Sequence, residues 1–333
     1  MNEKALRTLE YHKIIDLLVR HANCEAAKQR CKKLTPMTSL ADIETAQRQT
    51  ADALSRIFKK GSLSFLGVHD VTASMKRLEI GAALSIEELL HLASLLEVAK
   101  RAKAYSRNDR TEEAETSDSL DEFFDGIEPL TPLLEEIRRC IISSDEISDD
   151  ASSGLKAVRR SMKGMQDKIH SQMNSILNSA SASGLLQDNV ITMRNGRYCL
   201  PVKSEYKNQV SGMVHDQSST GSTLFIEPLA VVNLNNELKE LYLKEQEEIE
   251  KILADLSNLV SEYIPYILED YRILSELDFI FAKAKLSKKM QGSEPLFDQD
   301  YIHIKKGRHP LIPKDKVVPI DVTLGKTYDL LII

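Results

Sequence analysis

Two long stretches with heptad-like spacing flank one short β-like stretch, and this arrangement constrains the fold more than any other feature of the sequence. Apolar residues recur at steps of three and four on both sides of residues 190–228, with an interruption at Glu245 in the second stretch, and this spacing is typical of helices that pack along their length. The first set is Leu155, Val158, Met162, Met165, Ile169, Met173, Ile176 and Ala180, and the second is Leu234, Leu238, Leu241, Ile252, Leu256, Leu259 and Tyr263. The sequence therefore predicts an antiparallel coiled-coil arm with a small β tip, and two ordinary bundle helices are the alternative.

The first of these helices is expected to run from Ala151 to Leu186, about 50 Å at 1.5 Å per residue. Pro265 is expected to kink or end the returning helix, because proline removes a backbone donor and clashes with the preceding turn. A further helix should follow it, since Leu274, Leu277 and Phe281 keep helical spacing.

Charge is distributed unevenly along the chain, whose 333 residues have a formal net charge of −6. Residues 151–228 alone carry a clear excess of cations, with nine Lys and Arg against five Asp and Glu. A polyanion responds to charge within a Debye length, about 10 Å at 0.1 M salt. The acidic balance of the whole chain therefore does not exclude nucleic acid, and we expect the β-like stretch inside this basic segment to bind it.

Four cations in that stretch are the candidate nucleic-acid-binding residues. Asn195-Gly196 lies between two β-like runs and predicts a tight hairpin that holds Arg194 and Arg197 side by side. The other two candidates, Lys203 and Lys207, follow within eleven residues of the turn. Such a group would contact phosphates, so binding should be sensitive to salt and largely independent of base sequence. A solvated hairpin with ordinary surface cations is the alternative.

The first 148 residues predict a helical body without visible chemistry. A capping box indicates a helix from Ile86 to Ala104. Residues 109–125 are acidic and contain Ser and Thr, so we expect a loop there. Thr131 followed by Pro132 is typical of an N-cap and the first residue of a helix.

The pattern changes to short strands near the C-terminal end of the sequence. Strands are expected at residues 301–304, 317–322 and 328–333. The last is a continuous apolar run, which is typical of a strand buried on both faces. Because the sequence stops on this run, we expect the domain to continue beyond it.

Several function classes are disfavoured. His215, Asp216 and Ser218 are too close in sequence to form a hydrolase triad, and neither a GxSxG nor a GxxxxGK[ST] motif occurs. The four cysteines lack metal-ligand spacing and are expected to be free thiols in a reducing compartment. We therefore expect no catalytic residue and no metal site. Without a membrane-length apolar run or a signal-like N-terminus, the chain is expected to be cytoplasmic, with no membrane partner.

Six segments together carry a resemblance to a known family. They are VITMRNGRYCLPVKSEYK (190–207), HDQSSTGSTLFIEP (215–228), NLNNEL (233–238), GRHPLI (307–312), VVPIDV (317–322) and LLII (330–333). This combination resembles the bacterial MutS type-II branch, the MutS-like ATPases without a mismatch-reading domain, and the resemblance spans essentially the whole chain. It implies a homodimeric ABC-type ATPase with a helical lever, a coiled-coil clamp, an ATPase domain and usually a C-terminal Smr nuclease.

The resemblance also implies partners and cofactors. Family members are associated with suppressing homologous recombination at branched DNA and with sensing and splitting collided ribosomes, so branched DNA and rRNA are the expected partners. ATP and Mg²⁺ would serve the full-length protein, but no cofactor is expected in this chain, because the Walker A loop would follow the strand that ends at Ile333. Val317, Val318 and Pro319 match part of the adenine pocket, with Val317 in place of an aromatic residue. We therefore expect no ATP hydrolysis by this chain alone.

The sequence thus predicts a mainly α fold in three regions. These are a helical lever and core body in residues 1–148, a long antiparallel coiled-coil clamp arm with its β tip at 190–228 in residues 149–290, and the first strands of an α/β ATPase domain in residues 291–333. The expected function is a nucleic-acid or ribosome clamp. The alternative is an interaction arm in which the coiled coil is a spacer and the β tip docks a protein.

Overall fold

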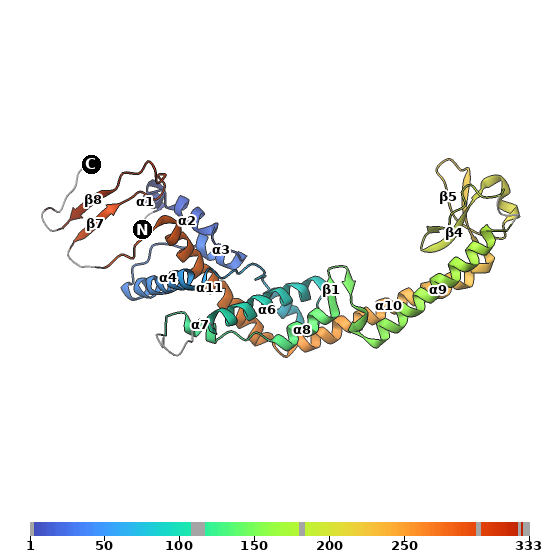
Figure 1. Cartoon of the computed structure of the whole chain (residues 1–333), viewed down its shortest axis with the longest axis horizontal. Coiled ribbons are helices and arrows are strands. Elements are labelled where there is room, and N and C mark those ends of the chain that lie inside the picture. Colours follow the sequence, from blue (N-terminus) through green and yellow to red (C-terminus); the bar gives the residue numbers. More distant parts are fainter. Residues whose placement is uncertain (1–2, 108–116, 180–183, 298–300, 326–327, 329–333) are drawn as a thin grey trace. The chain divides into compact units, whose positions relative to one another are not determined.

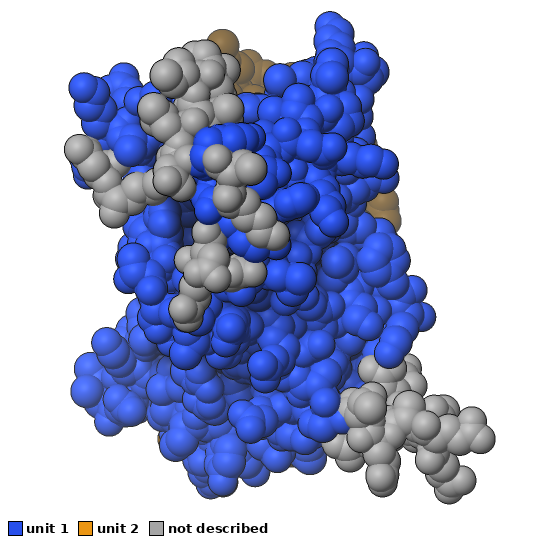
Figure 2. All heavy atoms as spheres, turned by 90° about the vertical axis from the view of Figure 1, so that its left-hand side faces the viewer, with its two compact units in different colours: residues 1–82, 87–135, 259–333 blue, residues 83–86, 136–258 orange. Residues whose placement is uncertain are grey.

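The chain is mainly α-helical, as predicted, in a computed structural model. The structure describes residues 3–107, 117–179, 184–297, 301–325 and 328. It divides into two compact units (Figure 1). Unit 1 comprises residues 1–82, 87–135 and 259–333, and unit 2 comprises residues 83–86 and 136–258. Figure 2 colours the units separately and faces unit 1. The predicted position of Ala180, the start of the expected acidic loop and the strand residues after Tyr328 lie outside the described residues.

Unit 1 is built around α11 (Ile264–Met290), which packs against several other helices of the unit. The other helices of the unit are α1 (Glu3–Thr8), α2 (Tyr11–Val19), α3 (Glu25–Lys32), α4 (Leu40–Lys60), α5 (Thr72–Glu79), α6 (Ile86–Arg107), α7 (Asp121–Asp125) and the first part of α8 (Thr131–Cys140). Of these, α2, α3, α4, α5 and α7 pack against α11, and α6 contacts it through Tyr105 and Phe281. Apolar residues occur around the whole circumference of α11, so it is enclosed by its neighbours. Pro265 lies in its first turn, which confirms the predicted break in the chain at this proline.

Three predictions about the body can be compared directly with these helices. The helix expected from Ile86 is confirmed and ends at Arg107. α8 begins at Thr131, so this residue is the first of the helix and not its N-cap. The prediction of a loop through residue 125 was wrong for its last part, because residues 121–125 form α7. The buried Phe124 packs under Arg56, whose guanidinium also pairs with Asp121, and these contacts hold the segment as a helix despite its acidic composition.

The C-terminal part of unit 1 contains a two-stranded antiparallel sheet of β7 (Ile302–Gly307) and β8 (Ile320–Leu324). The predicted strand at residues 301–304 is confirmed and extends to Gly307. The prediction for residues 317–322 was partly wrong, because the strand begins at Ile320 and the preceding residues form no ladder.

Unit 2 contains two long helices, α9 (Ser153–Leu177) and α10 (Leu229–Ser261), which run antiparallel beside each other (Figure 1). Arg159 contacts Glu245, and further along α9 Gln166 contacts Tyr242, so rising numbers on one helix meet falling numbers on the other. A small hairpin of β1 (Ile141–Ser143) and β2 (Glu146–Ile147) precedes them, followed by the 3-10 turn η1 (Asp149–Ala151). The predicted stripe is confirmed in part, since Met162, Ile169, Met173 and Leu238 share one core cluster.

The prediction that α9 reaches Leu186 was wrong. The helix ends at Leu177, and Leu186 instead forms a β-bridge with Val202. After Leu177 the chain reads Asn-Ser-Ala-Ser-Ala-Ser-Gly, and short polar side chains of this kind compete for backbone hydrogen bonds. Ser179 shows the effect, because its hydroxyl donates to the Ile176 carbonyl over 2.7 Å at the helix end.

Between the two long helices, residues 190–228 form the β tip. Its strands are β3 (Thr192–Arg194), β4 (Arg197–Lys203), β5 (Gly212–Gln217) and β6 (Thr223–Pro228), with the 3-10 turn η2 (Ser204–Gln209) after β4. All neighbours pair antiparallel in the order β3-β4-β6-β5. The predicted hairpin is confirmed: Asn195 and Gly196 have φ of 51° and 73°, the positive values of a type I′ turn.

One face of the β tip packs on the helices, and this contact positions the tip at the end of the pair. Tyr198, Leu200 and Val202 of β4 alternate inward. They join one apolar cluster with Leu224 and Ile226 of β6, Ile169 and Met173 of α9, and Val231 and Leu238 of α10. The alternate residues of the two central strands, Cys199, Pro201, Thr223 and Glu227, are buried as well, so the accessible surface of the tip lies at the strand ends, in η2 and along β5.

Candidate nucleic-acid interface

The second face of the β tip carries polar residues of its strands beside the buried Cys199 and Pro201. Along β4 and β6, residues such as Arg197 and Glu227 alternate with the inward apolar ones. The two edge strands approach each other across this face: Arg194 Nε lies 3.3 Å from Asp216 Oδ2, and Asn195 Nδ2 donates to the His215 carbonyl over 3.2 Å. Because β3 and β5 are not neighbours in the ladder, these contacts show that the sheet is curled.

A buried carboxylate organises the curled face. The Glu227 side chain is 0% exposed, and its Oε1 accepts from Arg197 Nη1 and from Asn235 Nδ2, each over 2.7 Å. Its Oε2 lies 2.5 Å from His215 Nε2. An ionised carboxylate can only accept, so His215 can pair with it by donating through Nε2. Three partners thus compensate a charge that would otherwise be costly to bury.

Two asparagines of α10 extend this network into the helix. Asn235 Nδ2 donates to the Tyr198 carbonyl, and its Oδ1 accepts from the Tyr198 N–H, each over 3.3 Å. Asn236 Oδ1 accepts from Arg197 Nη2 over 2.5 Å. The segment NLNNEL therefore fastens the β tip to α10 through side-chain amides.

The four predicted cations differ in how free they are. Lys207 is exposed and has no ion pair within the described part of the chain. The Lys203 ammonium lies 6.0 Å from the centre of the Tyr206 ring and within 3.4 Å of the Gly184 carbonyl. The Arg194 guanidinium stacks 3.9 Å from the Phe225 ring centre and faces Asp216, with the two side chains 38% and 49% exposed. Arg197 is committed to Glu227 and Asn236 and is 21% exposed.

The sequence patterns did not reveal the residues that hold this face together, namely Glu227, Asn235 and Asn236. Two signals pointed to them. Glu227 is a charged residue at the end of an apolar strand run, and the asparagines lie inside a helix, where they are unfavourable without a partner. The His215 ring lies against Glu227 of the neighbouring strand.

The cysteine thiols are buried in the part of the protein that the structure describes. Burial raises the pKa of Cys24, Cys31 and Cys199 to about 11, and it also raises the pKa of Cys140. A thiol must ionise to act as a nucleophile, so these side chains are poorly suited to catalysis. Within the described residues no cluster of His, Cys, Asp and Glu could hold a metal ion.

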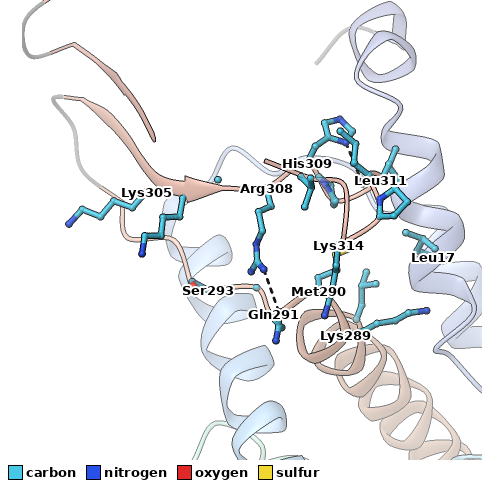
Figure 3. Close-up of a pocket in the computed structure, with 18 residues that line it drawn as sticks. Leu17, Lys289, Met290, Gln291, Ser293, Lys305, Arg308, His309, Leu311 and Lys314 are labelled. Atoms are coloured by element: carbon cyan, nitrogen blue, oxygen red, sulfur yellow. Dashed lines mark hydrogen bonds between the residues drawn. The ribbon is translucent and has the colours of Figure 1, made fainter. Parts of the chain in front are cut away.

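Unit 1 contains a separate pocket of about 860 Å³ beside the C-terminal end of α11 (Figure 3). Val317 lines it, together with Lys289, Lys314 and the segment around Arg308. Of the other predicted adenine-pocket residues, Val318 is 77% exposed, and neither it nor Pro319 lines the pocket. The structure therefore brings one of these three residues to a pocket with cationic walls.

None of the described helices is long and apolar enough to cross a membrane. No protein-family model matches the chain. Curated relatives from Agathobacter rectalis and Lachnoclostridium phytofermentans are each 57% identical to it, over 334 and 338 residues, and one from Lachnospira eligens is 51% identical over 334 residues. All three are named Endonuclease MutS2, and each match covers 100% of this chain and 42% of the relative, so the chain spans less than half the length of these proteins. Because it shares this identity with them over its whole length, the chain belongs to the MutS2 family.

Proposed function

We propose that the β tip binds the phosphate backbone of nucleic acid and that α9 and α10 form the coiled-coil clamp arm that presents it. The main observation behind this proposal is the pair of cations Lys203, at the end of β4, and Lys207, in the following turn η2. The sheet that carries them is fixed to α10 by the buried Glu227 network. The relatives are named as endonucleases, enzymes whose substrates are nucleic acids, and this supports the choice of ligand.

Within this proposal the four cations have two roles. Lys207, Lys203 and Arg194 contact phosphate, since each is at least partly exposed. Arg197 can reach phosphate only by leaving Glu227, which would remove one of three partners of a buried carboxylate, and breaking a buried ion pair typically costs about 3–5 kcal/mol. We therefore assign Arg197 mainly to positioning the sheet.

The parent protein is proposed to be a homodimeric, ATP-dependent MutS-like enzyme with three regions in this part of its chain, divided near residues 148 and 290. Val317, Val318 and Pro319 would contribute one side of an adenine pocket. ATP and Mg²⁺ binding elsewhere in the protein would open or close the arms on branched DNA or on the rRNA of collided ribosomes.

A protein-docking tip is the second candidate, and one observation favours it. Strand β5 is at an edge of the sheet and exposes Met213 and Val214, which are 51% and 41% accessible. Exposed edge strands with apolar side chains are templates for pairing with a partner strand. In this case the cations would only keep the tip solvated.

The salt dependence of binding separates the two candidates. We would measure binding by fluorescence anisotropy, with a labelled four-way DNA junction and a labelled rRNA stem-loop as probes, between about 50 and 200 mM KCl. The unsubstituted 333-residue chain is compared with Lys203→Ala/Lys207→Ala. Losing two phosphate contacts should flatten the slope of log K against log salt by about 1.8 for duplex regions.

The matched control is Lys239→Ala/Lys251→Ala, which removes two cations from α10 in the same unit. This control should leave the slope unchanged. If the unsubstituted chain binds neither probe, or if binding does not depend on salt or on Lys203 and Lys207, the phosphate-binding proposal fails. Met213→Ser would then test the docking surface.

A further inference from the structure

The excess of positive charge in residues 151–228 lies on α9 and not on the β tip. The β tip, residues 190–228, has four Lys and Arg against three Asp and Glu. α9 carries five cations and a single acidic residue, Asp167. The cations of α9 are Lys156, Arg159, Arg160, Lys163 and Lys168. The basic character of residues 151–228 therefore belongs mostly to the helix that leads to the tip.

Two of these cations are committed to acidic partners. Arg159 is partly buried and pairs with Asp149 over 2.6 Å and with Glu245 of α10 over 2.7 Å. Lys156 pairs with Asp150 over 2.7 Å, where both side chains are largely exposed and the pair contributes little. Arg159 is thus structural, whereas Lys156 can exchange its partner at small cost.

Arg160 and Lys163 are exposed and form no ion pair among the residues that the structure describes. Together with Lys156 they follow steps of four and three, so they lie on one side of the helix. The buried residues of α9, among them Leu155, Met162 and Ile169, lie about 120° away around the helix axis, at about 100° per residue. We call Lys156, Arg160 and Lys163 the α9 stripe.

The dimensions of the α9 stripe suit a polyanion. Its ends are seven residues apart, about 10 Å along the helix axis at 1.5 Å per residue. Phosphates of one DNA strand advance about 3.4 Å per residue along the duplex axis, so the stripe spans about three of them. Fixed cations on a rigid helix would neutralise such a row without the ordering cost of a loop.

The acidic residues of α10 do not account for the stripe. α10 carries seven Asp and Glu against three Lys. Its Glu245 faces α9 and is taken by Arg159, while Glu248 pairs with Lys251 of α10 itself. Arg160 and Lys163 therefore form no ion pair with α10 among the described residues, although Asp167 follows Lys163 by four residues on the same side of α9.

We propose that the α9 stripe is a second phosphate-binding surface, so that nucleic acid held by the β tip is also bound along the shaft of the arm. This inference rests on the proposed function, because it names a further part of the same ligand's binding surface. The inference differs from the proposed function in the binding residues, which lie on α9 and outside the β tip.

The test uses the 333-residue chain with Arg160→Glu/Lys163→Glu, and a labelled 40-base-pair duplex as the probe. We expect affinity at 100 mM KCl to fall at least tenfold and the salt slope to flatten by about 1.8, as for two lost phosphate contacts. The matched control is Lys239→Glu/Lys251→Glu, which changes the net charge equally on α10. Arg160→Gln/Lys163→Gln tests the same contacts without adding repulsion, and circular dichroism checks that each variant is folded.

Each outcome separates this inference from the function on which it rests. If both charge reversals weaken binding equally, net charge and not a stripe is responsible, and the inference is overturned. If the tip variant Lys203→Ala/Lys207→Ala weakens binding while the α9 variants do not, the tip proposal stands and the stripe fails. If the α9 variants change sedimentation of the chain and leave duplex binding intact, the stripe instead faces a second copy, and the inference is again overturned.

Discussion

Arg197 Nη1 lies 2.7 Å from Glu227 Oε1 and joins two neighbouring strands of the β tip at a carboxylate that solvent does not reach. The pair is not isolated, because Asn235 and His215 contact the same carboxylate from α10 and from β5. A cation first predicted to face a ligand is thus bound within the sheet. The role of Arg197 is therefore to pair with the buried Glu227 carboxylate.

Glu227→Ala should destabilise the β tip strongly. Removing one partner of a buried, hydrogen-bonded pair typically costs about 3–5 kcal/mol, and Arg197 is well enough shielded for the low end of that range to apply. The measurement is the free energy of unfolding in urea, followed by circular dichroism. The control is Asp216→Ala, which breaks the more exposed pair with Arg194 and should cost less than about 1 kcal/mol. Equal effects of the two substitutions would contradict this account.

Gly196→Ala and Gly164→Ala should change stability in opposite directions. Gly196 has φ of 73° in the hairpin turn, a region that L residues enter at a cost of about 1–2 kcal/mol. Gly164 lies inside α9, and a Cβ built there meets no atom within 4 Å. Alanine at this helical site should stabilise by about 0.5–1 kcal/mol. Urea unfolding of both variants measures the difference, and a stabilising Gly196→Ala would show that the turn is not type I′.

The contrast between the hairpin and the Glu227 network shows what the sequence could and could not predict. Asn195-Gly196 is a local signal, since the turn needs two adjacent residues with positive φ, and a short window of sequence is enough to predict it. The structural roles of Glu227 and Asn235 depend on contacts with Arg197 and Tyr198, which are 30 or more residues away in the sequence. Periodicity identifies the inward face of a strand but not which polar side chain will be enclosed on the other face.

The same limit explains two errors in the helices. Heptad spacing continued past Leu177, but a run of Ser and Ala ended α9 there. The segment 121–125 was too acidic to suggest a helix, yet it forms one because Phe124 is buried and Arg56 reaches Asp118 and Asp121. Tertiary contacts of this kind override local composition and cannot be read from a short window.

Thiol reactivity should report the fold of both units. Cys24, Cys31 and Cys199 are buried with a pKa raised to about 11, so at pH 8 almost no thiolate is present. We expect less than one equivalent of thiol to react with Ellman's reagent within minutes in buffer, and all four after unfolding in guanidinium. Rapid reaction of Cys199 alone would indicate that the β tip opens, and Gly196→Ala should accelerate it.

Asp270 of α11 should make unit 1 less stable as the pH rises. Its side chain is buried, with Oδ1 accepting from the Glu128 N–H over 2.9 Å and Oδ2 without a hydrogen-bond partner among the described atoms. Burial raises its pKa to about 7, from about 4 in the unfolded chain. Between these two values the unfolded state releases its proton first, so the free energy of unfolding falls as pH rises from 4 to 7.

Asp270→Asn removes this titration and keeps an oxygen that can accept from the Glu128 N–H. The variant should lose less stability between pH 4 and 7 and should be more stable than the parent at pH 8, by a few times the 1.4 kcal/mol that corresponds to one pKa unit. Asp278, also buried on α11 with a raised pKa, should retain part of the slope. The control is Glu269→Gln: Arg272 lowers the pKa of this exposed carboxyl, so its contribution is present above pH 4.5 and is lost on acidification. Urea unfolding of the three proteins at pH 4, 6 and 8 measures these slopes, and an unchanged slope in Asp270→Asn would show that this carboxyl ionises normally in the folded protein.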